Sequence, residues 1–260
     1  MLVRPVYAVL ERELLRMARQ RTRLVAAMVR PLIWLLVIGG GFAAIVGVDY
    51  KSFLVPGVLG MTMLFGAMLA ALGTVYDKES GVMRMMLVAP LPRAWMVVAK
   101  LIAAAAAAAV QALLLLVLLA LLGYVGRRTE WGLLAAALAA TSFACAGIGM
   151  LTASFSRTLE NFAGIMNFVI FPVFFLSGSL YPVRELPPAL YWAATLNPYT
   201  YGVDLLKHAL LAGPGADFSV ALDLAVLAAA TIASAAVASW RFSRESAYEP
   251  MIHVPAGRAR

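Results

Sequence analysis

Long stretches without a charged side chain decide what this sequence can fold into. Seven such runs, each between one charged residue and the next, hold 18 residues (31–48), 25 (52–76), 26 (101–126), 26 (131–156), 23 (161–183), 18 (186–203) and 17 (224–240). An α-helix needs about 20 apolar residues to cross the roughly 30 Å of hydrocarbon in a bilayer. Hydrophobic residues make up 63% of the chain and charged residues 13%, against about 45–50% and about 25% in soluble proteins. The sequence therefore predicts an all-α polytopic membrane protein.

Six of these stretches predict membrane-spanning helices within a single transmembrane domain over residues 1–260. We expect the spans at about 24–47, 53–76, 95–122, 131–154, 161–180 and 218–240. The run 186–203 contains Pro187, Pro188 and the pair Asn197-Pro198. Prolines remove backbone donors, and Asn-Pro favours a turn. We therefore expect 181–215 to form short, broken, re-entrant helices before the last span.

The segment 5–23 has the pattern of an amphipathic helix. Apolar residues recur at helical spacing on one face (Val6, Leu10, Leu14 and Met17), and arginines recur on another (Arg12, Arg16, Arg19 and Arg23). Such a helix is expected to lie in the headgroup region, with its arginines towards anionic membrane lipid. The alternative is a solvated helix on the cytosolic side.

The distribution of basic residues predicts the orientation of the chain in the membrane. With six spans and both ends on one side, 16 of the 21 lysines and arginines fall on the side of the termini. Cytoplasmic loops of membrane proteins carry such an excess. We therefore expect both termini, the loop 77–93 and the tail 241–260 in the cytoplasm. We also expect no cleaved signal peptide, because the first apolar run is too long for a signal-peptide core.

Several classes of catalytic and binding site find no support in the sequence. A single cysteine, Cys145, provides no disulfide framework, and the two histidines, His208 and His253, form no zinc motif. None of the four lysines follows a glycine, so no phosphate-binding Gly-Lys loop is present. Most basic residues behind the net charge of +8 flank apolar runs, which indicates membrane topology and not a nucleic-acid surface. We expect no enzymatic activity and no metal, cofactor or nucleic acid bound by this chain.

The expected cytosolic loop between the second and third spans has a distinctive composition. It opens with charges at Asp77, Lys78 and Glu79, continues past Gly81 into a stretch of Met and Leu, and closes with two prolines. A short apolar helix between polar ends suits docking into a groove of a partner protein, where methionines adapt well. The alternative is an ordinary loop helix that lies on the bilayer.

This loop resembles that of the ABC-2 type exporter permeases. The family pattern has an acidic residue, a glycine, a leucine-rich turn, a proline and a lysine that opens the third span, and Glu79, Gly81, Leu87, Pro90 and Lys100 match it. A second and more specific match is the C-terminal signature, here at 175–182, 186–187 and 197–204. The family often has Arg where this chain has Lys207, which keeps the charge but not the bidentate geometry. The resemblance covers essentially the whole chain and is closest to short bacterial permeases for drugs or lipo-oligosaccharides.

The resemblance implies a transport subunit in the bacterial inner membrane that works as a pair, expected to be a homodimer. It implies two separate ATPase subunits, which would bind ATP and Mg²⁺, and export of a hydrophobic or lipid-linked substrate. The residues implied in coupling to the ATPase are Asp77, Glu79, Gly81, Arg84, Leu87, Pro90 and Lys100. The alternative is a secondary transporter or channel without an ATPase. Such proteins usually place ionisable residues inside their spans, and here Asp223, near a helix end, is the candidate.

The segment 178–204 is expected at the outer mouth of the transport path. Prolines there prevent one continuous helix, and aromatic residues crowd it (Tyr181, Tyr191, Trp192, Tyr199 and Tyr201). These aromatic side chains are expected either to form an interfacial belt or to belong to a lid that closes the path. The candidate outer-gate residues are Gly178, Pro182, Pro187, Asn197, Pro198, Tyr199, Tyr201 and Asp204.

Overall fold

The described part of the chain is helical. The computed structural model describes residues 7–8, 10–12, 15, 29–41, 50–82, 93–126, 129–211 and 215–248, and these contain no β-strand. The elements are η1 (Trp34–Ile38, a π-helical turn), α4 (Tyr50–Glu79), α6 (Arg93–Leu121), α7 (Trp131–Phe155), α8 (Leu159–Phe175), η2 (Val183–Glu185, a 3₁₀ turn), α9 (Pro188–Leu196), α10 (Pro198–Leu211) and α11 (Val220–Tyr248). The all-α prediction is confirmed for these residues.

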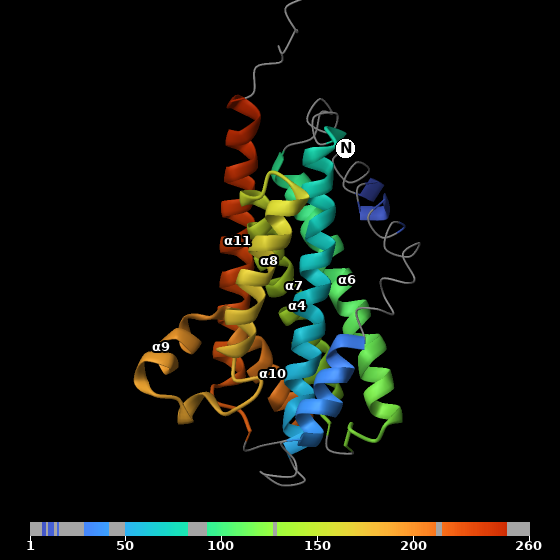
Figure 1. Ribbon diagram of the computed structural model, residues 1–260, viewed down its shortest axis with the longest axis vertical. Helices are drawn as coiled ribbons and strands as arrows, with labels where there is room; N and C mark the ends of the chain where they lie inside the picture. The colour runs from blue at the N-terminus through green and yellow to red at the C-terminus, as the bar shows by residue number, and fades with distance from the viewer. Residues whose placement is uncertain are drawn as a thin grey trace, which may run out of the picture.

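The long helices form one elongated bundle (Figure 1). We call the end where α4 stops and α8 begins the Glu79 end, at the top of Figure 1, and the opposite end, where α10 lies, the Asp204 end. Within the described residues, four helices are long and apolar enough to cross a membrane, namely Phe53–Glu79, Ala94–Leu121, Trp131–Phe155 and Val220–Arg244. They correspond to four of the six predicted spans.

In the part of the chain that the structure describes, the other two predicted spans are represented by shorter apolar helices, Val29–Gly41 and Leu159–Phe175, and residues 24–28 and 42–47 of the first predicted span lie outside that part. The second of these, α8, has 17 residues, which extend over about 25 Å. It stops before residue 180 because the chain turns at Gly178, whose φ of +72° lies in the left-handed region that favours glycine. Six complete spans therefore stay a prediction.

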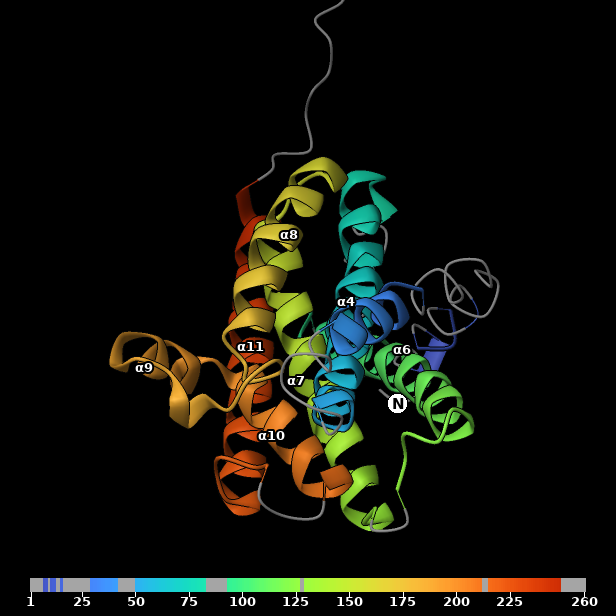
Figure 2. The same cartoon turned by 60° about the horizontal axis from the view of Figure 1, so that its bottom comes forward.

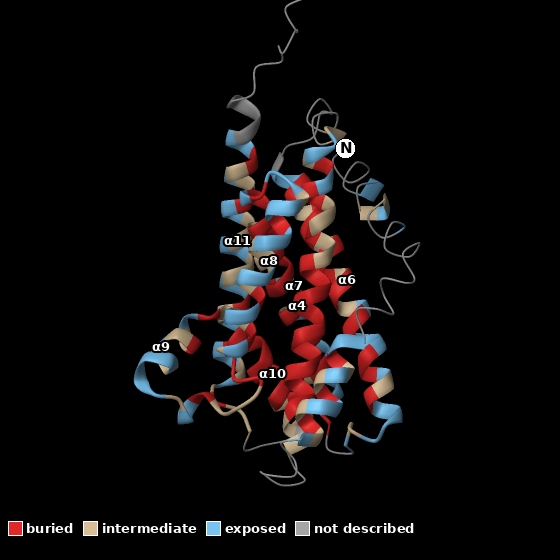
Figure 3. Ribbon diagram, viewed as in Figure 1, coloured by how far each residue is buried: buried red, intermediate tan, exposed pale blue. Residues whose placement is uncertain are grey.

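Helix α4 is the centre of the bundle. It packs against α6, α7, α8 and α10. In its most apolar stretch of 18 residues, 83% is buried inside the bundle. The most apolar 18-residue stretch of α11 is only 11% buried, and Figure 3 shows this contrast along the two helices. The core is thus concentrated around α4, while α11 leaves most of its surface uncovered by the described residues.

Within the predicted re-entrant segment 181–215, residues 183–211 form short helices separated by prolines. Helix α9 begins at Pro188, and its N-cap residue is Pro187. Helix α10 begins after Asn197, whose Oδ1 accepts a hydrogen bond from the Tyr199 N–H at 3.1 Å. Helix α9 projects from the side of the bundle, whereas α10 lies within it (Figure 2). The depth of this segment in a membrane stays a prediction.

Several predicted features lie outside the described residues. They are most of the segment 5–23, with Arg16 and Arg19; residues 83–92, with Arg84, Leu87 and Pro90; and the end of the tail, 249–260.

Candidate functional site

At the Glu79 end, three candidate residues from different parts of the sequence lie together. They are Arg12 of the N-terminal segment and the coupling candidates Asp77 and Lys100. Asp77, in the last turn of α4, is 2% exposed, and its Oδ2 lies 2.5 Å from Lys100 Nζ in the first turns of α6. The same oxygen lies 2.7 Å from Arg12 Nη2. A buried charge is costly unless it is paired, so Asp77 holds α6 and the N-terminal segment against α4.

Lys78 connects the same end of α4 to α7. Its ammonium group donates hydrogen bonds to the backbone carbonyls of Ala153, Ser154 and Ser156 at 3.1, 3.1 and 3.3 Å. The last carbonyls of a helix have no partner inside the helix and carry the negative end of its dipole. Lys78 also lies 4.5 Å from the centre of the Phe242 ring of α11. One cation therefore caps α7 and contacts α11.

Glu79, the next residue, connects α4 to the start of α8. Its Oε2 accepts a hydrogen bond from the Leu159 N–H at 2.8 Å, and Thr158 Oγ1 accepts one from the Asn161 N–H at 3.2 Å. The free N–H groups at a helix start carry the positive end of the dipole, so a carboxylate stabilises α8 there. Contact of Glu79 with an ATPase stays a prediction, and the structure adds this intramolecular partner.

Gly81 lies in the turn that follows α4. Its φ is +76° and its N–H donates to the Lys78 carbonyl at 3.2 Å. A residue with a Cβ is strained in this conformation. The glycine thus sets the direction in which the chain leaves α4.

The Asp204 end contains a buried polar cluster of Asp204, Lys207, His208, Asp217 and Asp223. Asp204 accepts hydrogen bonds from the backbone N–H groups of Asp217 and Phe218 at 2.7 and 2.9 Å. Burial raises the pKa of Asp204 above its usual value, and these two hydrogen bonds act in the opposite direction. Asp204 therefore holds Asp217 and Phe218, just before α11, against α10.

Asp217 is the second anchor of this cluster. It accepts hydrogen bonds from the Val183 and Arg184 N–H groups at 3.1 and 3.4 Å, and its Oδ2 lies 3.5 Å from Lys207 Nζ. Lys207 is 1% exposed, and its ammonium group also lies 5.0 Å from the centre of the Phe53 ring of α4. The turn at η2, the start of α11 and α4 are joined through this cation and carboxylate.

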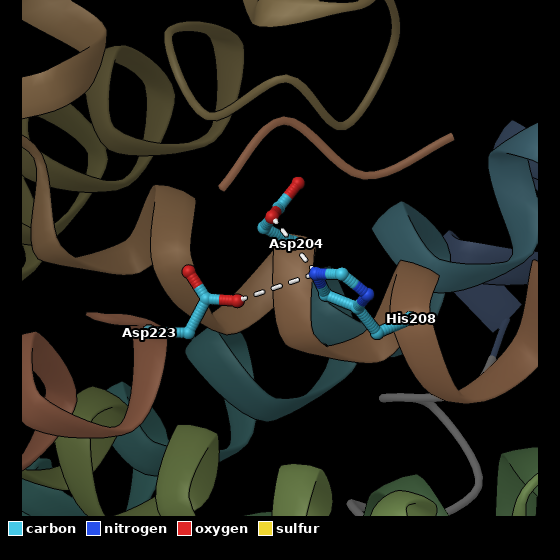
Figure 4. A group of neighbouring side chains, drawn as sticks. All are labelled: Asp204, His208 and Asp223. Atoms are coloured by element: carbon cyan, nitrogen blue, oxygen red, sulfur yellow. Dashed lines mark ion pairs between the residues drawn. The ribbon is translucent and has the colours of Figure 1, made fainter. Parts of the chain in front are cut away.

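His208 lies between two carboxylates of the cluster. Its Nε2 is 3.7 Å from Asp204 Oδ2, 4.0 Å from Asp223 Oδ2 and 2.9 Å from the Phe218 carbonyl oxygen. Figure 4 shows the three side chains converging from α10 and α11.

The candidate gate tyrosines are core residues. Tyr199 is 1% exposed and Tyr201 7%. Tyr201 donates to the Thr195 carbonyl at 2.9 Å, and its ring centre lies 4.9 Å from that of Phe218. An interfacial belt requires rings at the surface, so that interpretation does not hold for these two, whereas Trp192 of α9 is 66% exposed.

Other candidate gate residues shape the backbone here. A Cβ on Gly178 would lie 2.5 Å from Val183 Cγ2, so the turn admits no larger residue without a shift. Asn197 donates from Nδ2 to the Val173 carbonyl at 2.7 Å, which ties the start of α10 to α8. Pro182 and Pro187 are the N-cap residues of η2 and α9.

The sequence did not single out Lys78 or Asp217 as site residues. Their partners lie about 75 and 34 positions away along the chain, and no local pattern reveals such distant contacts. The available signal was a charged residue at the boundary of an apolar run, which applies to many residues in this chain.

Comparison with known proteins shows the family of this chain. Residues 4–211 match the family model for ABC-2 type transporters. Nodulation protein J of Rhizobium leguminosarum bv. trifolii is 30% identical over 203 residues, which cover 75% of this chain and 76% of that protein. The inner membrane transport permease YadH of Escherichia coli (strain K12) is 24% identical over 175 residues, which cover 67% and 68%. This chain belongs to the ABC-2 type transporter permease family.

Proposed function

We propose that this chain is the permease subunit of an ATP-driven exporter. It moves a hydrophobic or lipid-linked substrate, such as a drug, a lipid or a lipo-oligosaccharide, out across the bacterial inner membrane. ATP and Mg²⁺ bind to two copies of a separate ATPase subunit, and a second copy of this permease completes the path. The Glu79 end and both termini face the cytoplasm in this proposal.

The observation that carries the proposal is the convergence of α6, α7, α8, α11 and the N-terminal segment on three consecutive residues of α4. Asp77 pairs with Lys100 of α6 and with Arg12, Lys78 caps α7 and contacts α11, and Glu79 caps α8. The segment 80–92 follows directly. An ATPase that moves this segment displaces the end of α4 and acts on all these elements together. It must bind two permease states with different affinity, since otherwise no shift results.

The nature of the substrate is proposed from the composition of the long helices. Charged side chains on the four membrane-type helices cluster near the helix ends, as Asp77, Lys78, Lys100 and Asp223 do. A charged solute would need polar partners along the path. An apolar or lipid-linked substrate needs few, and the exposed face of α11 offers apolar surface to lipid or to the second copy of the permease.

The test is co-purification with a candidate ABC ATPase from the same organism, followed by measurement of substrate-stimulated ATP hydrolysis. Gly81→Pro is the informative variant, because proline holds φ near −65° and lacks the N–H that Gly81 donates. We expect this variant to insert and fold but to lose bound ATPase or stimulated hydrolysis. Glu160→Ala removes an exposed acidic residue at the same end and is the matched control. Wild-type export and ATPase retention in Gly81→Pro would contradict the coupling role.

The same experiment separates the proposal from a secondary transporter. The buried polar cluster at the Asp204 end places ionisable groups where an ion-coupled carrier could use them. Export that continues without the ATPase, and stops when the proton gradient is dissipated, would favour that second function. Export that depends on the ATPase and survives an uncoupler would support the first.

A further inference from the structure

We propose that Asp204, His208 and Asp223 form a binding site for a divalent transition-metal cation of the zinc type, which links α10 to α11. The three residues each point one ligand atom towards a common space, and these atoms lie within 4.8 Å of one another (Figure 4). Asp204 and His208 stand one turn apart on α10, and Asp223 comes from the first turn of α11.

Asp223 is the observation that points to a ligand. Its side chain is 0% exposed, and neither carboxylate oxygen has a hydrogen-bond partner among the described residues. A buried carboxylate without a partner is costly. Asp223 Oδ2 faces His208 Nε2 at 4.0 Å, which is too long for a hydrogen bond but leaves space for a cation between the two atoms.

The charged side chains around this space also favour a bound cation. Lys207 and Arg184 lie against Asp217 and not between the other two carboxylates. Lys207 also stabilises the charge of Asp204, but among the described residues His208 is the side chain that pairs with both Asp204 and Asp223, and it is uncharged in the form that ligates a metal. A dication balances these two carboxylates.

The distances suit a metal with short bonds to nitrogen and oxygen. Zinc binds histidine and carboxylate at about 2.0–2.2 Å, so two ligands of a tetrahedral site lie roughly 3.3 Å apart. The separations of 3.7 and 4.0 Å from His208 Nε2 need only a small inward rotation of the side chains. An imidazole ligand also favours zinc-like cations over Mg²⁺ and Ca²⁺, which prefer oxygen.

The surroundings hold two of the ligands in place. Asp204 receives backbone hydrogen bonds on both oxygens, and each oxygen keeps a second lone pair for a metal. The Phe218 carbonyl oxygen, 2.9 Å from His208 Nε2, is within reach as a fourth ligand once the metal displaces the Nε2 proton. The His208 side chain is 25% exposed, which gives a cation or water access from one side.

The sequence alone predicted no metal site, because the spacing of its histidines fits no zinc motif. The site becomes visible only when α10 folds back on α11, which brings Asp223 beside a histidine 15 positions earlier in the chain. The inference concerns binding and is independent of the proposed export function.

The experiment uses the full chain, purified without a histidine tag, stripped with a chelator and titrated with Zn²⁺. We expect one zinc per chain for the wild type and for His253→Gln, which removes the other histidine. His208→Gln and Asp223→Asn should bind at least about tenfold more weakly, and zinc should raise the thermal midpoint of the wild type but not of these variants. Wild-type affinity in both variants, or no binding by the wild type, would overturn the proposal.

A variant that gains a spectroscopic signal distinguishes the loss of a metal ligand from misfolding of the protein. His208→Cys keeps a ligand at the same position, so Co²⁺ bound to it should show a thiolate-to-cobalt charge-transfer band that the wild type lacks. The buried Cys145 is present in both proteins and controls for the other thiol. Absence of the band in a folded His208→Cys protein that binds Co²⁺ would exclude residue 208 as a ligand.

Discussion

Lys100 Nζ lies 2.5 Å from Asp77 Oδ2, and the two side chains are 4% and 2% exposed. This contact joins the end of one membrane-type helix to the start of the next in the chain. Asp77 has a second cation at 2.7 Å, Arg12. Both cations therefore contact the same carboxylate, that of Asp77.

Removal of Asp77 should cost more stability than removal of Lys100. Asp77→Asn removes the charge that both Lys100 and Arg12 contact, whereas a change at one cation breaks one contact, and breaking a buried pair costs about 3–5 kcal/mol. Lys100→Met leaves Asp77 paired with Arg12, so we expect a smaller loss, and the double variant should recover part of the cost. Thermal unfolding in detergent measures the order. Arg157→Ala, an exposed cation at the same end, is the control, and an equal loss in all single variants would contradict the argument.

Glu79→Ala should loosen the start of α8. The variant removes the acceptor of the Leu159 N–H, and loss of a capping acceptor costs about 0.5–2 kcal/mol. Hydrogen exchange at Leu159 should accelerate several-fold, while the amides in the middle of α8 change little. Glu79→Gln keeps an acceptor oxygen and should show a smaller effect. Unchanged exchange at Leu159 in Glu79→Ala would show that the cap has no energetic role.

Gly57→Ala should separate α4 from the turn after α8. A Cβ at this position would lie 2.6 Å from the Ser179 carbonyl oxygen and 3.0 Å from Ser179 Cα. These are backbone atoms that side-chain rotation cannot move, so we expect a loss of about 1–3 kcal/mol. Gly164→Ala in α8 is the matched control, because a Cβ there meets no described atom within 4 Å and alanine favours helix. Equal thermal midpoints of the two variants would contradict the packing.

Single cysteines should report the orientation of the chain. Arg184→Cys should react with an impermeant thiol reagent added to intact cells, since the Arg184 side chain is 70% exposed and lies near the Asp204 end. Arg244→Cys is also at an exposed position but should react only after the cells are opened. The native Cys145 is 0% exposed, so its background should be low. Labelling of Arg244→Cys in intact cells would reverse the proposed orientation.

The sequence predicted the helices well where the cause is local. Uncharged runs bounded by charges marked α4, α6, α7 and α11, because a membrane excludes charge along the whole length of such a helix. Prolines marked the breaks at Pro187 and Pro198 for an equally local reason, the missing N–H.

Side-chain partners were harder to predict because they depend on tertiary packing. The aromatic pattern predicts Tyr199 in a belt or lid, yet it is buried against α4, where a Cβ on Gly60 would lie 2.6 Å from the tyrosine hydroxyl. A glycine on one helix made room for a ring on another, and neither residue indicates this alone. The same holds for Asp223, which a one-dimensional pattern places near a helix end and the fold places beside His208.

The adjacent charges Lys78 and Glu79 restrict how α4 can move. Consecutive helical residues point about 100° apart, and here the cation faces the carbonyls that end α7 while the anion faces the amide that starts α8. Turning α4 about its own axis by one residue in one sense would set the carboxylate of Glu79 against carbonyl oxygens. Turning it in the opposite sense would set the ammonium of Lys78 against an N–H group. Either contact would be repulsive. Helix α4 can therefore tilt or slide between the two ends of the bundle, but it cannot transmit motion by rotating about its own axis.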